Sequence, residues 1–257
     1  MIAALTDLLP LLSATLWHGI VVFLRMSAMV TVLPAFGETA VPMRVKLGIA
    51  IAFTMIIMPA VPVQPAPPDP LVLARFTLTE VVVGLALGLG VRLFVLALHT
   101  AGSIAAQSTS LSQILGGAAV EPIPAMGYVM VVGGLALAVM AGLHVRAAEL
   151  MIYSYQVFPA GGFIPGRDLS AWGVGRISQA FSLAFMLAAP FVITSVLYNL
   201  TLGVINRAMP QLMVAFVGAP VITLGGIFML FLCTPILLSV WVEALMMFMA
   251  DPLGPAQ

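Results

Sequence analysis

Residues 206–211 read Asn-Arg-Ala-Met-Pro-Gln and stand between two long stretches without a charged side chain. No Asp, Glu, Lys or Arg occurs in the 30 residues from Ile177 to Asn206, or in the 35 residues from Ala208 to Val242. An arginine in lipid or in a dry protein interior is costly unless it reaches water or a partner, and a proline stops the propagation of a helix. The block therefore predicts a specified break between two apolar helices.

The composition of the whole chain is typical of a membrane protein or a membrane assembly. Of its 257 residues, 62% are apolar and 7% are charged, whereas about 25% of the residues of a soluble domain are charged. The formal net charge is zero, so the chain has no basic field that would attract nucleic acid. We expect contact with membrane lipid and no nucleic-acid partner.

Six predominantly apolar stretches reach or approach the roughly 20 residues that a helix needs to cross the hydrocarbon core. They are expected at Leu8–Leu33, Leu47–Pro59, Leu71–Leu98, Met126–Leu143, Ile177–Asn206 and Met213–Met249. The last two are long, and Pro190, Pro220 and Pro235 are expected to kink or split them. The sequence thus predicts an all-α integral membrane or membrane-assembly protein of about six long, kinked hydrophobic helices, some as bent hairpins. We expect a single membrane domain spanning residues 1–257.

The expected connectors differ in character. Pro59–Pro70 is rich in proline and is expected to be a stiff extended spacer. Gly102–Pro124 is small and polar, and Arg146–Arg176 contains several Gly and Pro residues that indicate turns.

The distribution of Arg and Lys does not give a consistent orientation. Arg44 and Lys46 would place the first connector inside the cell. With six alternating spans, the connector that holds Arg146, Arg167 and Arg176 then falls outside. Either the number of spans differs from six or the protein is not a conventional bilayer-spanning bundle, and both interpretations stay open.

Four ionisable residues are set deeply in apolar sequence: Arg25, Glu80, Arg92 and Glu243. Such residues mark a transport path, form ion pairs inside the protein, or lie at wet helix ends. The chain shows neither symmetric halves nor a ladder of carboxylates, which favours pairing or wet helix ends. A stand-alone secondary transporter with Arg25, Glu80 and Glu243 as a coupling set is the alternative.

No arrangement of residues indicates catalysis. His18, His99 and His144 are far apart, and none has a second His or Cys at the spacing of metal ligands. The chain also contains no Gly-rich phosphate loop and no nucleophile elbow. We expect no enzymatic activity, no cofactor and no metal.

The run Gly84-Leu-Ala-Leu-Gly88-Leu-Gly90 places small residues at helical spacing in apolar sequence. This spacing allows another helix backbone to approach closely. We therefore expect a helix-packing surface here rather than a ligand site.

Three groups of motifs occur in order along the chain. The first is Phe23-Leu-Arg25-Met-Ser-Ala-Met29, followed by Pro34 and by Pro42-Met-Arg44-Val-Lys-Leu-Gly48. The second is Glu80-Val-Val-Val-Gly84-Leu-Ala-Leu-Gly88, followed by Ala101-Gly102. The third is Gly203-Val-Ile-Asn-Arg207-Ala-Met-Pro210-Gln211-Leu-Met-Val-Ala-Phe216-Val-Gly218-Ala-Pro220. Together they resemble the FliR family of export-apparatus proteins, which serve flagellar and virulence type III secretion systems.

The resemblance implies a core subunit of the type III export gate in the bacterial inner membrane and the flagellar basal body, partly on the periplasmic side. It implies assembly with FliP and FliQ, and contact with FlhB and FlhA, to form a channel for unfolded export substrates. It also implies a structural or partner-interface role for Arg25, Pro34, Pro42, Arg44, Gly48, Glu80, Gly84, Gly88, Arg207, Pro210, Gln211, Phe216 and Pro220. Flagellar and virulence systems share these motifs, so both stay open.

The family also carries a loop that plugs the closed pore, between the third and fourth hydrophobic segments. The matching positions run from Gln107 to Pro122, and the candidate plug residues are Gln107, Leu111, Ile114, Leu115, Gly116, Gly117 and Pro122. Many relatives have phenylalanines in this loop, whereas this chain has none. A second departure is Ala141-Gly-Leu-His144, where relatives usually have Asn-Gly-His.

Overall fold

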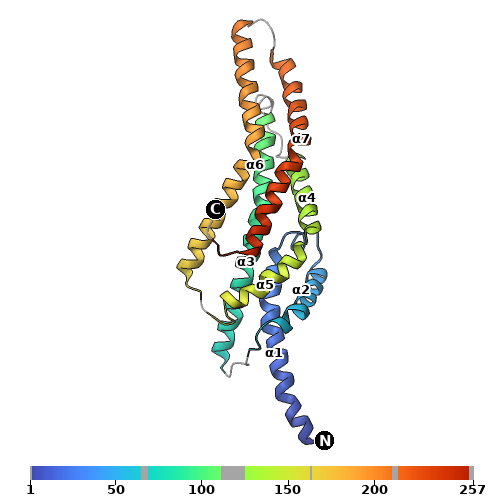
Figure 1. The fold of residues 1–257 in the computed structure, drawn as a ribbon, viewed down its shortest axis with the longest axis vertical. Coiled ribbons are helices and arrows are strands. Elements are labelled where there is room, and N and C mark those ends of the chain that lie inside the picture. Colours follow the sequence, from blue (N-terminus) through green and yellow to red (C-terminus); the bar gives the residue numbers. More distant parts are fainter. Residues whose placement is uncertain (1, 65–68, 111–124, 163, 210–213, 255–257) are drawn as a thin grey trace. The chain divides into compact units, whose positions relative to one another are not determined.

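The computed structural model describes residues 2–64, 69–110, 125–162, 164–209 and 214–254, without the side chains of 2–12, 109–110, 125 and 214–220. Within these residues it is built of helices and contains no strand (Figure 1). The elements are α1 (Ile2–Val32), α2 (Met43–Ile57), the 3-10 helix η1 (Met58–Ala60), α3 (Pro70–Ser110), α4 (Ala125–Met140), α5 (Leu143–Val157), α6 (Gly166–Ala208) and α7 (Val214–Ala250). The all-α prediction is confirmed.

The helix ends follow from local chemistry. Asp69 caps α3, because its Oδ1 accepts the backbone N–H of Leu71 at 3.0 Å, and Pro70 suits the first helical position, where no N–H is needed. Pro42, in an extended conformation with φ −59° and ψ 145°, precedes α2. In the first turn of α2, the backbone N–H of Val45 then donates to the Pro42 carbonyl oxygen at 2.9 Å.

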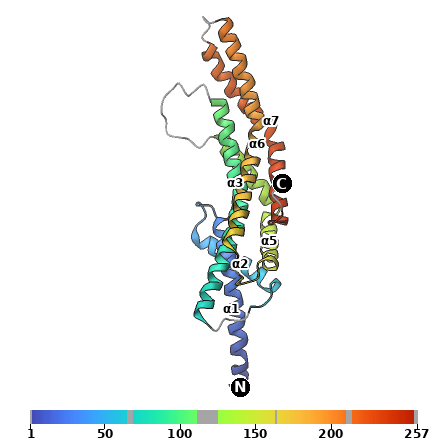
Figure 2. The ribbon, with the colours of Figure 1, turned by 90° about the vertical axis from the view of Figure 1, so that its left-hand side faces the viewer.

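The predicted break at residues 206–211 is confirmed by the helix boundaries. α6 ends at Ala208 and α7 begins at Val214. Figures 1 and 2 show the two helices as an antiparallel pair on either side of this break. Pro190 lies inside α6, and Pro220 and Pro235 lie inside α7, so none of the three splits its helix.

Two expected connectors are partly helical. Residues 102–110 belong to α3, residues 146–157 belong to α5, and residues 166–176 belong to α6. The prediction of a turn-rich connector was wrong for α5, since this helix buries Leu143, Ala147, Leu150, Met151, Ser154 and Tyr155 along one face. The chain bends between α4 and α5 at Gly142, whose φ of +88° is costly for residues with a side chain.

The lengths and composition of the helices fit a membrane protein. Five helices among the described residues are long and apolar enough to cross a membrane, or six if the bent pair α4 and α5 counts as one span. Large apolar side chains are exposed along α6 and α7, among them Phe185 at 62% and Phe231 at 78%. Surfaces of this kind require lipid or another protein chain as their neighbour.

The chain divides into two compact units. One comprises Met1–Leu93, Gly142–Arg176 and Leu245–Gln257, and the other comprises Phe94–Ala141 and Ile177–Ala244. In the second unit the core is organised around Trp241, which is completely buried and donates from Nε1 to the carbonyl oxygen of Phe94 at 2.8 Å. The first unit contains the polar core described next.

Candidate functional site: a buried ion pair where α1 crosses α3

Arg25 of α1 and Glu80 of α3 form an ion pair in the core of the first unit. Both side chains are completely buried. The guanidinium donates from Nε to Glu80 Oε2 at 2.7 Å and from Nη2 to Glu80 Oε1 at 3.1 Å. This two-point geometry is the strongest arrangement that an arginine and a carboxylate form.

Arg25 makes two further hydrogen bonds. Nη1 donates to the Ser154 hydroxyl oxygen at 3.0 Å, and Nη2 donates to the Phe158 carbonyl oxygen at 3.0 Å. The guanidinium carbon lies 3.7 Å from the ring centroid of Tyr155, a distance at which an aromatic face attracts a cation. Every guanidinium nitrogen therefore makes at least one hydrogen bond, and α5 supplies several of the contacts.

Glu80 accepts two further hydrogen bonds. The Tyr155 hydroxyl donates to Oε2 at 3.3 Å, and the backbone N–H of Gly161 donates to Oε1 at 3.0 Å. One carboxylate thus joins α1, α3, α5 and the turn after α5. A charge with this many partners is held in place, because losing any partner would leave a buried polar group unpaired.

Two glycines of α3 permit the close crossing that brings Arg25 to Glu80. A β-carbon at Gly84 would overlap the carbonyl oxygen of Arg25, and one at Gly88 would lie 2.9 Å from the carbonyl oxygen of Met29. The crossing is therefore too close for any larger residue at these two positions. The helix packing expected of this small-residue run is present at Gly84 and Gly88.

Gly161 combines two structural requirements. Its φ is +69°, a left-handed conformation that residues with a β-carbon rarely adopt. A β-carbon there would also lie 2.6 Å from the Phe76 ring. Glycine at this position thus allows the backbone N–H to reach Glu80.

The other residues of the N-terminal motif lie apart from the ion pair. Pro34 is buried in the turn after α1, whereas Pro42, Arg44 and Gly48 are exposed at the start of α2. No heavy atom lies within 4 Å of a β-carbon built on Gly48. Packing among the described residues therefore does not require glycine at residue 48.

The C-terminal block and the expected plug are only partly described. Arg207 is exposed in the last turn of α6, and Gln107 is exposed near the end of α3. Pro210 and Gln211 lie outside the described residues, as do Leu111, Ile114, Leu115, Gly116, Gly117 and Pro122. Phe216 and Pro220 belong to α7, and their side chains are not described.

The remaining deeply set charges do not join the ion pair. Arg92 is half-buried and donates from Nη1 to the carbonyl oxygen of Val32 at 3.4 Å, and Glu243 is exposed. Of the proposed coupling set, Arg25 and Glu80 are bonded to each other. The structure thus supports pairing as the role of these two charges.

Tyr155, Ser154, Phe158 and Gly161 were not identified from the sequence as parts of the site. All four lie in the stretch interpreted as a connector. The spacing of buried residues in α5, at positions 143, 147, 150, 151 and 154, is the signal that would have revealed a helix with its inward face at Ser154.

Comparisons with a family model and with known proteins all give the same family. The family model for bacterial export proteins, family 1, matches residues 16–248. The chain is 33% identical over 226 residues to the flagellar biosynthetic protein FliR of Caulobacter vibrioides, covering 86% of this chain and 90% of that protein. It is 28% identical over 220 residues to FliR of Escherichia coli, covering 83% of each chain. It is 26% identical over 226 residues to FliR of Bacillus subtilis, covering 86% of this chain and 87% of that protein.

Proposed function

This chain belongs to the FliR family of bacterial export proteins, and we propose that it is a core subunit of the flagellar export gate in the bacterial inner membrane. The observation that carries the proposal is the family match over residues 16–248. The match includes both residues of the Arg25–Glu80 ion pair, the whole of α2 to α6, and most of α7. The relatives quoted above are flagellar proteins, which favours a flagellar over a virulence system.

In this proposal the chain assembles with FliP and FliQ, and contacts FlhB and FlhA, to form the channel for unfolded export substrates. The exposed apolar side chains of α6 and α7 support assembly, because neighbouring helices or lipid must cover them. Part of the assembly lies on the periplasmic side of the membrane.

The buried ion pair acts as a structural clamp in this proposal. Arg25 and Glu80 hold α1, α3 and α5 together through hydrogen bonds of 2.7–3.1 Å. A clamp of this kind keeps the first unit rigid while substrate passes through the gate. It contributes no group that binds cargo.

Two further parts of the proposal rest on the family resemblance. Residues 107–122 form the plug that closes the resting pore, with apolar side chains and glycines giving a compliant seal. Arg207 and Gln211 bond to partner subunits at the break between α6 and α7. The exposed position of Arg207 is compatible with this role.

An export assay tests the proposed function. Deleting the gene for this chain should abolish secretion of flagellar hook and filament proteins into the medium, and supplying the chain from a plasmid should restore secretion. Immunoblots of the medium, with a cytoplasmic protein as lysis control, measure the effect. Unchanged flagellar secretion in the deletion strain would contradict the proposal, and loss of virulence-type secretion alone would assign the chain to the other system.

A further inference from the structure

One face of α3 borders two neighbouring cavities in the first unit. A cavity of about 540 Å³ is lined by α3 residues from Leu71 to Val82 and by Gly162 and Ile164. A second cavity of about 210 Å³ continues at Val83, Ala86 and Leu87. Ile164 lines both. Val82 of the larger cavity and Ala86 of the smaller one are four residues apart and lie on the same side of α3, so the two cavities adjoin along the helix. Together they are called the groove.

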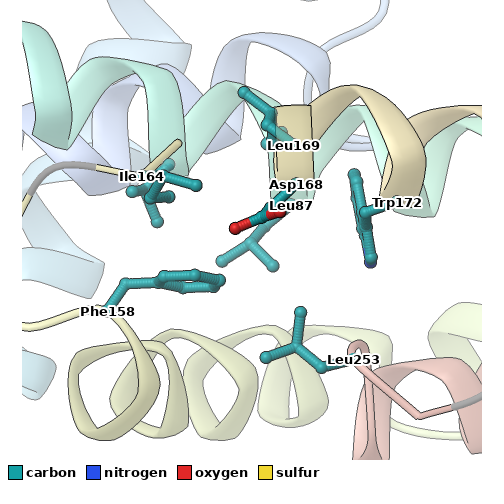
Figure 3. Close-up of a pocket in the computed structure, with 9 residues that line it drawn as sticks. Leu87, Phe158, Ile164, Asp168, Leu169, Trp172 and Leu253 are labelled. Carbon is teal, nitrogen blue, oxygen red and sulfur yellow. The ribbon is translucent and has the colours of Figure 1, made fainter. Parts of the chain in front are cut away.

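The groove is mostly apolar, but each of its two cavities contains one charged residue, and the two charges are opposite in sign. Arg75 lines the larger cavity, and no carboxylate of the described residues lies within ion-pair distance of it. Asp168 lines the smaller cavity, where Figure 3 shows its carboxylate beside Leu87, Phe158 and Ile164. A ligand with a negative head would be attracted to the Arg75 end and repelled from the Asp168 end.

Arg75 is better suited to bind an anion in the larger cavity than the polar groups near it, Asp69 and Thr79. The Asp69 carboxylate is negative and caps α3 through the N–H of Leu71. The Thr79 hydroxyl lines the cavity but already donates to the carbonyl oxygens of Arg75 and Phe76, at 3.0 Å each. A guanidinium without a carboxylate partner is well suited to a phosphate group, which it binds through two parallel N–H groups.

The dimensions of the groove match one lipid chain. Arg75 lies five residues after the first residue of α3, a helix long and apolar enough to cross a membrane. From Arg75 to Leu87 the helix rises by about 18 Å, at 1.5 Å per residue. One leaflet contributes roughly 15 Å of hydrocarbon, half of the bilayer core. An acyl chain that follows the groove from a head at Arg75 would therefore run along α3 for about the thickness of one leaflet.

We propose that this groove binds one anionic phospholipid, with its phosphate on Arg75 and one acyl chain along α3 past Val82 and Ile164 toward the second cavity. Phosphatidylglycerol has this chemistry, since its phosphate is not neutralised by an ammonium group. Its acyl chain would cover apolar surface at Leu78, which is 66% exposed. The bound lipid would fill the space between α3 and the start of α6.

Binding of phosphatidylglycerol to the full chain in detergent, followed by native mass spectrometry, tests the proposal. Arg75→Gln should weaken binding about tenfold, because it removes a charge-assisted contact to phosphate. Arg167→Gln is the matched control: it removes the same charge from another exposed arginine, which does not line the groove, and should leave binding unchanged. Val82→Trp should weaken binding by filling the path of the acyl chain.

The results that would overturn the proposal are equally specific. Equal affinity of the wild type and Arg75→Gln, or equal losses for Arg75→Gln and Arg167→Gln, would show that Arg75 does not hold the lipid. Competition by millimolar inorganic phosphate would indicate a phosphate site rather than a lipid site. In cells, a photocrosslinker at Leu78 should yield lipid adducts, and adducts with another protein alone would show that a partner helix covers the groove.

Discussion

Replacing Glu80 by alanine should strongly destabilise the chain. The change leaves the Arg25 guanidinium completely buried without its carboxylate, and it removes the acceptor for the Tyr155 hydroxyl and the Gly161 N–H. Breaking a buried ion pair by removing one partner typically costs about 3–5 kcal/mol. For a chain of this size, such a loss lowers the unfolding temperature by roughly 6–20 °C.

Thermal unfolding of the purified chain in detergent, followed by tryptophan fluorescence, measures this effect. The exposed pair Arg146–Glu149 provides the matched control, because its side chains are 50% and 56% exposed and its atoms are 2.8 Å apart. Glu149→Ala should cost no more than about 0.5 kcal/mol. The contrast isolates burial, since both substitutions remove one carboxylate from an arginine.

A double-mutant cycle makes the test more specific. The cycle comprises Arg25→Met, Glu80→Leu and the double variant. The double variant leaves no unpaired charge in the core, so it should be more stable than Glu80→Leu alone. The coupling energy between the two positions should be about 2–3 kcal/mol. A Glu80→Ala variant that unfolds within 2 °C of the wild type, or additive effects in the cycle, would refute the clamp.

Four further outcomes follow from the described contacts and the proposed function. Gly84→Ala should destabilise the isolated chain by about 1–3 kcal/mol through overpacking, whereas Gly48→Ala has room and should not; equal unfolding temperatures for the two variants would contradict the close helix crossing. Gly161→Ala should lower the unfolding temperature because of its positive φ and the nearby aromatic ring, and an unchanged melting curve would contradict this. Arg207→Ala should leave the isolated chain folded but reduce its recovery with FliP and FliQ; unchanged stoichiometry and stability of the complex would exclude that role. Deleting residues 110–117 should raise ion conductance through the assembled gate, and unchanged conductance would place the plug elsewhere.

Features that depend on local sequence could be predicted. Pro210 and Arg207 interrupt two uncharged stretches, and the structure breaks between α6 and α7 at that position. A long apolar stretch that lies in lipid or in protein forms a helix from its own sequence, without the help of distant residues. The all-α class and the approximate helix positions follow for the same reason.

Features that depend on distant contacts were only partly predictable. Arg25 and Glu80 are 55 residues apart, and their pairing requires the crossing of α1 and α3 that Gly84 permits. Their charges and apolar surroundings indicated that each residue forms an ion pair, but did not identify its partner. Tyr155 was missed because α5 carries Arg146 and Glu149 on its exposed face, which made it resemble a connector.

Co-expression of this chain with FliP and FliQ from the same bacterium tests the central claim most directly. The mass of the purified species, measured by native mass spectrometry, should correspond to one complex that contains all three proteins. A stable monomer or homodimer of this chain, with FliP and FliQ eluting separately, would contradict the claim and favour a stand-alone transporter.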